Sequence, residues 1–118
     1  MTRVRTASRK DANHDEIKDC LSKLGWSVLD IFQIPNSADL IVAKNGFTAL
    51  IECKDGAKSP SRRKLTDGER TFAESWRGYY CIIEGVSDAL TFDREVSHFG
   101  YPLESVFEDG PIIKKNPA

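Results

Sequence analysis

The sequence predicts a single α/β domain with a mixed sheet of about four strands flanked by helices, in the order αβββαβ. Three observations predict this class. Asn-Gly joins two apolar runs within residues 37–54, which indicates a β-hairpin. Both faces of this hairpin are apolar, as expected of strands in a sheet that is covered on two sides. Amphipathic patterns before and after the hairpin indicate that helices supply the cover.

The first helix is predicted by apolar residues at helical spacing between Ile17 and Leu24. Asn13 stands at the expected N-cap, and Gly25 ends the pattern. Glu16 has two interpretations. It can complete a capping box with Asn13, or it can be an acid of a functional site, because it lies beside the apolar stripe.

The other elements follow from turn residues and apolar runs. A second capping box, Thr66 to Glu69, begins a helix whose apolar side includes Phe72 and Trp76. A strand after a helix is expected to run parallel to the hairpin's second strand. In order, we expect a strand at 26–32, the hairpin, a loop at 55–65, this helix up to residue 77, a strand at 79–83, a short helix from about residue 87 and an irregular tail at 99–118.

Composition indicates a soluble protein of one domain, residues 1–118, with 40% hydrophobic and 30% charged residues. We find no apolar run near the ~20 residues of a membrane span and no secretory signal, and therefore expect a cytoplasmic location. Cys20, Cys53 and Cys81 read as reduced core thiols. Their wide spacing, with only two histidines in the chain, argues against a zinc site.

The net charge of −1 hides an uneven distribution, because residues 1–64 have a basic excess and residues 65–118 an acidic excess. Residues 1–11 are expected to be a flexible basic arm, which is either a loose tail or a clamp that orders on binding. A second basic group follows the hairpin directly. The two groups are Arg3, Arg5, Arg9 and Lys10, and Lys54, Lys58, Arg62, Arg63 and Lys64.

The hairpin turn also predicts a strand register. If Asn45 and Gly46 are the two loop residues, counting outward pairs Lys44 with Phe47, Ile41 with Leu50, and Asp39 with Glu52. Two carboxylates would then lie side by side, with Lys54 on the same face.

Opposed carboxylates destabilise a strand pair, so this arrangement needs an explanation. One explanation is a divalent cation held between Asp39 and Glu52, and oxygen ligands suit Mg²⁺ or Mn²⁺. The other is that both acids are solvated at the strand ends and have no function. Their position within Ile-, Leu- and Val-rich strands, beside Lys54, favours the cation.

These residues resemble the PD-(D/E)xK nuclease superfamily, and most closely the small stand-alone phage-type members of its VRR-NUC branch. The resemblance covers roughly residues 9–95, with Ala38 where the family usually has proline. The matching stretches are Arg9-Lys10-Asp11-Ala12-Asn13-His14, Ala38-Asp39-Leu40-Ile41-Val42, Ile51-Glu52-Cys53-Lys54-Asp55-Gly56, Pro60-Ser61-Arg62-Arg63-Lys64-Leu65-Thr66 and Trp76-Arg77-Gly78.

The resemblance implies a restriction-endonuclease-like core and a Mg²⁺- or Mn²⁺-dependent endonuclease that cuts branched, flap or Holliday-junction DNA during phage or mobile-element DNA processing. It implies a homodimer without an organic cofactor, in a bacterial or phage-infected cell. Asp39, Glu52 and the Cys53 backbone carbonyl would bind the metal, and Lys54 would orient water or stabilise charge. The resemblance favours Glu16 as a further site acid, acting directly or through water.

Phosphate contacts supply most non-specific affinity for nucleic acid. The candidates for such contacts are Lys58, Arg62, Arg63, Lys64, Arg9 and Lys10. Trp26, Phe72 and Trp76 are interpreted as core residues in preference to base-stacking platforms, and His14 and His98 as solvated or capping residues. The alternative function is a nuclease-fold module that binds nucleic acid or protein without catalysis, although the intact set of Asp39, Glu52 and Lys54 favours the enzyme.

Overall fold

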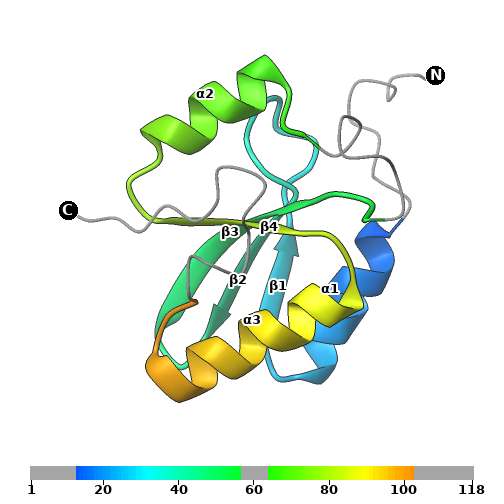
Figure 1. Ribbon diagram of the computed structural model, residues 1–118, viewed down its shortest axis with the longest axis vertical. Coiled ribbons are helices and arrows are strands. Elements are labelled where there is room, and N and C mark those ends of the chain that lie inside the picture. Colours follow the sequence, from blue (N-terminus) through cyan, green and yellow to red (C-terminus); the bar gives the residue numbers. More distant parts are fainter. Residues whose placement is uncertain (1–12, 57–63, 103–118) are drawn as a thin grey trace.

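The computed structural model describes residues 13–56 and 64–102, which form a four-stranded sheet with three helices (Figure 1). The predicted α/β class and the mixed sheet are confirmed. In chain order the elements are α1 (His14–Lys23), β1 (Ser27–Asp30), β2 (Leu40–Lys44), β3 (Phe47–Cys53), α2 (Asp67–Ser75), β4 (Tyr79–Ile83) and α3 (Val86–Phe99).

The sheet has the strand order β1-β2-β3-β4. Neighbouring strands are antiparallel from β1 to β3, and β4 runs parallel to β3 as predicted. Asn45 and Gly46 both have positive φ, 52° and 85°, as a type I′ turn requires. The counted register is confirmed from Lys44–Phe47 to Ile41–Leu50.

Helices cover the sheet on both sides. α1 and α3 lie together over one face (Figure 1), where the Phe92 ring of α3 packs 4.9 Å from Trp26. α2 lies apart from them (Figure 1) and packs Phe72 6.0 Å from Tyr80. Because side chains alternate along a strand, Tyr80 points away from the face that carries Cys81. All residues of β3 from Ala49 onward are buried, as the two-sided cover predicts.

Three predicted boundaries are corrected. β1 is shorter than the predicted strand at 26–32, since pairing with β2 ends at Asp30. α3 is a full helix of 14 residues and not a short one, with Ala89, Phe92 and Val96 buried at helical spacing. Phe99, where the irregular tail was expected to begin, is instead the last residue of this helix, whose C-cap is Gly100, and residues 103–118 of the expected tail lie outside the described residues. The predicted arm at 1–11 lies outside the described residues.

Candidate functional site

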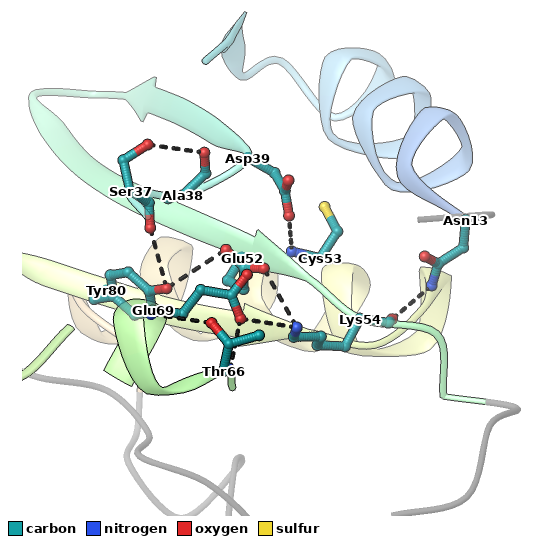
Figure 2. A network of polar contacts seen from close by, with 10 residues as sticks. All are labelled: Asn13, Ser37, Ala38, Asp39, Glu52, Cys53, Lys54, Thr66, Glu69 and Tyr80. Carbon is teal, nitrogen blue, oxygen red and sulfur yellow. Dashed lines mark hydrogen bonds and ion pairs between the residues drawn. The ribbon is translucent and has the colours of Figure 1, made fainter. Parts of the chain in front are cut away.

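Glu52 and Lys54 converge at the carboxyl end of β3, as predicted (Figure 2). The Lys54 ammonium lies 3.6 Å from Glu52 Oε2 and 3.0 Å from Glu69 Oε1 of α2. Glu52 is 5% exposed and Lys54 is 9% exposed. The buried pair of Glu52 and Lys54, with the partly exposed Glu69, forms the polar centre of the face that α2 covers.

The sequence identified Glu69 only as a helix cap, and it is also a member of this group. Its Oε1 atom accepts a hydrogen bond from the Thr66 backbone N–H at 2.9 Å, and its own N–H donates to Thr66 Oγ1 at 3.2 Å, so the capping box is confirmed. The same Oε1 accepts from Lys54. The spacing of Thr66 and Glu69 predicts a capping box whether or not Glu69 also contacts Lys54. The sequence therefore provided no indication of the contact between Glu69 and Lys54.

Burial raises the pKa of Glu52 well above its usual range, and the negative charges of Asp39 and Glu69 raise it further, against a partial offset from Lys54. The pKa of Glu69 changes in the opposite direction. Burial alone would raise it, but the hydrogen bond from Thr66 and the charge of Lys54 lower it. The two carboxylates therefore differ, and among the described residues the positive charge of Lys54 offsets the raised pKa of Glu52 only in part.

Asp39 does not form the counted pair with Glu52. The Asp39 N–H donates to the Ile51 carbonyl at 2.9 Å, and Ile51 is already the ladder partner of Leu40. Two successive residues thus oppose one, which is the arrangement of a β-bulge, and a bulge redirects a side chain. The predicted register fails at this last step because counting from a turn assumes an unbroken ladder.

The bulge places the Asp39 carboxylate on the side of the sheet that carries the Cys53 thiol (Figure 2). Asp39 Oδ2 accepts a hydrogen bond from the Cys53 backbone N–H at 2.7 Å. A ligand atom of each of Asp39, Cys53 and His14 lies within 4.8 Å of the others. Asp39 therefore belongs to this trio, and its negative charge also raises the pKa of Glu52.

The structure corrects the prediction for His14 and adds a new contact for Cys53. His14 is neither solvated nor a cap, since its side chain is fully buried. Cys53 and Cys81 are buried and form no disulfide, as predicted. The argument against a zinc site considered only the spacing of the cysteines along the sequence, whereas the fold brings Cys53 close to other possible metal ligands. In residues 13–56 and 64–102, the one set of three such ligands comes from α1, the start of β2 and the end of β3.

The predicted capping interaction between Asn13 and Glu16 is absent from the first helix. The Asn13 side chain makes no cap hydrogen bond, and its Nδ2 donates to the backbone carbonyls of Lys54 and Glu84 at 2.8 and 2.9 Å. Glu16 is exposed and lines a shallow depression on α1 with Asp15 and Lys18. The structure does not bring Glu16 into the group of Glu52, Lys54 and Glu69.

Lys64 is the one predicted phosphate-contacting residue that the structure describes, and it is exposed just before Thr66. Among the aromatic residues, Trp26 is buried as predicted. Trp76 is not a core residue, since it is 39% exposed and stacks on Phe72 at 5.6 Å. The other predicted contacts lie outside the described residues, namely Arg9, Lys10, Lys58, Arg62 and Arg63.

The donor set fits a hard divalent cation. The negative charges of Asp39 and Glu69 act on the buried Glu52 carboxylate, and the Lys54 ammonium lies 3.6 Å from it, although the bulge turns the Asp39 carboxylate toward the face of the sheet that carries the Cys53 thiol. A buried carboxylate with further negative charges acting on it is costly unless a proton or a cation neutralises it. Carboxylate oxygens are the ligands that Mg²⁺ and Mn²⁺ prefer.

Comparison of the chain with models of known protein families, with curated proteins and with solved structures found no match. Among the helices that the structure describes, we find none with the length and apolar character needed to cross a membrane.

Proposed function

We propose that this protein is a Mg²⁺- or Mn²⁺-dependent DNA endonuclease of the VRR-NUC type, with a restriction-endonuclease-like core. The observation that carries the proposal is the buried Glu52 carboxylate. Burial raises its pKa, the charges of Asp39 and Glu69 raise the pKa further, and the Lys54 ammonium lies 3.6 Å away. Such perturbed carboxylates cluster at functional sites.

Asp39, Glu52 and the Cys53 backbone carbonyl are the residues that would hold the cation. When bound, a divalent cation polarises a phosphoryl oxygen and supplies a hydroxide-like nucleophile near neutral pH. The Lys54 ammonium forms an ion pair with Glu69 Oε1 at 3.0 Å, which fixes its position. In that position it would orient water or stabilise the charge that develops on phosphoryl oxygens. Glu16 acting through water stays a prediction.

The DNA strand is proposed to run over the basic segment that follows Lys54. Exposed Lys64 supports this path, because it lies in the chain directly before the helix that carries Glu69. Further parts of the proposal are a preference for branched DNA, a homodimer with two sites, and a role in phage or mobile-element DNA processing in the cytoplasm. These parts rest on the resemblance of the motifs.

Incubation of the purified protein with supercoiled plasmid and with a four-way junction tests the proposal. We expect cleavage with Mn²⁺ or Mg²⁺ and none with EDTA. If folded protein cuts neither substrate with either metal, the enzyme proposal is wrong. Gel-shift binding of the same junction without cleavage would then favour the binding-module alternative.

A further inference from the structure

We propose that His14, Asp39 and Cys53 form a second metal site, suited to a borderline-soft divalent cation such as Zn²⁺. One ligand atom from each residue lies within 4.8 Å of the others. Small side-chain rotations would bring these atoms to the bond lengths of roughly 2.0–2.3 Å that Zn²⁺ requires. Three protein ligands with an open fourth position form a recurrent zinc arrangement.

The buried His14 ring supplies an independent indication of a ligand. Its Nε2 atom lies 2.8 Å from Asp30 Oδ1, while Nδ1 is buried and makes no hydrogen bond with any residue that the structure describes. A buried polar atom without a partner is costly. A cation bound at Nδ1 would satisfy this atom, so the His14 ring is oriented to act as a metal ligand.

Asp30 completes the arrangement in the way that metal-binding histidines usually require. Such histidines donate their second ring N–H to a carboxylate, which fixes the tautomer and the ring orientation. Asp30 is itself held by Lys18. Burial alone would raise the pKa of Asp30, but its hydrogen bonds with Lys18 and His14 lower it, so the carboxylate is well suited to accept from the ring.

The donor set distinguishes this site from the site at Glu52. One nitrogen, one sulfur and one carboxylate oxygen favour Zn²⁺ over Mg²⁺, which prefers oxygen ligands alone. The thiol of Cys53 and the ring of His14 are fully buried, whereas Asp39 is partly exposed and provides the approach for the ion. On binding, the Cys53 thiol would lose its proton to the solvent and coordinate as a thiolate.

The two sites share Asp39, and this sharing gives the second site a regulatory role. A Zn²⁺ ion that engages the Asp39 carboxylate removes one ligand from the cation proposed to act in DNA cleavage. Zn²⁺ is therefore an inhibitor that competes with Mn²⁺ or Mg²⁺. The inhibition rests on the proposed nuclease function, whereas binding of Zn²⁺ does not.

Titration of the tag-free protein with Co²⁺, a spectroscopic substitute for Zn²⁺, tests binding without reference to activity. We expect one Co²⁺ per chain with a thiolate-to-cobalt charge-transfer band, and displacement of Co²⁺ by Zn²⁺. Cys53→Ser should abolish the band, and Asp30→Asn should weaken binding about 10- to 100-fold. Cys20→Ser and His98→Gln are controls that should bind as wild type.

Circular dichroism checks that each variant is folded, and His14→Gln provides a second test if Cys53→Ser does not fold. The inference is overturned if wild type binds no Co²⁺, or if the band persists in folded Cys53→Ser or His14→Gln. Zn²⁺ added to a Mn²⁺ cleavage reaction should inhibit wild type at least 10-fold more strongly than His14→Gln. Absence of any cleavage would refute the proposed function and leave the binding result standing.

Discussion

Asp39 Oδ2 lies 2.7 Å from the Cys53 backbone nitrogen and accepts its hydrogen bond. A side chain proposed to bind metal therefore also joins the start of β2 to the end of β3. The bulge at Asp39 makes this contact, because it turns the carboxylate toward Cys53. Asp39 therefore contributes both to the proposed metal site and to the fold, so a substitution that tests its metal binding has to preserve the hydrogen bond from Cys53.

Asn13→Ala should destabilise the protein by roughly 1–3 kcal/mol, because one buried and one partly buried carbonyl group lose their donor. These carbonyls belong to Lys54 and Glu84, which follow β3 and β4. Urea unfolding measures the effect. Ser75→Ala is the matched control, since it removes an exposed hydrogen bond to a backbone carbonyl and should change stability by less than about 0.5 kcal/mol. Equal effects of both variants would show that the Asn13 contacts contribute nothing special.

Glu52→Gln should raise the melting temperature of the metal-free protein by several degrees at pH 8 while abolishing cleavage. Burial raises the pKa of Glu52 well above its ordinary value. Between the pKa of the unfolded state and the higher pKa of the folded state, the folded protein thus binds more protons than the unfolded protein, and wild-type stability falls as pH rises through this window. The neutral amide removes this loss.

Thermal unfolding in EDTA at pH 8 and at pH 4 measures the effect of Glu52→Gln. The gain should shrink at pH 4, where the wild-type carboxyl group is protonated. Glu74→Gln changes an exposed acid of α2 and should leave the melting temperature within about 1 °C of wild type at both values. A destabilised Glu52→Gln at pH 8 would contradict the account of Glu52 as a buried, poorly compensated charge.

Lys54→Met should lower the cleavage rate about 10²- to 10³-fold, the usual loss when one electrostatic stabiliser of a transition state is removed. It should also destabilise the fold at pH values where Glu52 and Glu69 are ionised, because these two carboxylates lose their shared cation. Single-turnover cleavage and thermal unfolding measure the two effects. Lys23→Met is the control, as it breaks only an exposed pair with Asp19. A Lys54→Met enzyme of wild-type rate would remove Lys54 from the proposed site.

Local geometry explains why much of the fold could be predicted. Asn45-Gly46 fixes a turn and hence the register of its neighbours, because few residues accept positive φ. The Thr66 capping box fixes the start of α2 in the same way. By contrast, Gly85 is the N-cap of α3 and makes no side-chain cap hydrogen bond. The length of α3 is therefore indicated only by the spacing of its apolar residues, which is a weaker pattern.

The site was less predictable because its contacts join segments far apart in the chain. The partners of Asn13 lie 41 and 71 residues away, and no local pattern distinguishes them from a helix cap. The same holds for His14, whose burial and contact with Asp30 arise only when α1 packs on the sheet. Asp39 shows the limit of register counting, since one bulge moves a side chain to the other face.

Single-turnover cleavage of a four-way junction by Asp39→Asn, in Mn²⁺, tests the central claim most directly. Asparagine retains an oxygen that can accept the hydrogen bond from Cys53, so the fold is expected to persist while the charged metal ligand is lost. We predict a rate about 10²- to 10³-fold below wild type, with an unchanged rate for the exposed variant Asp19→Asn. A folded Asp39→Asn protein that cuts at the wild-type rate would contradict the claim.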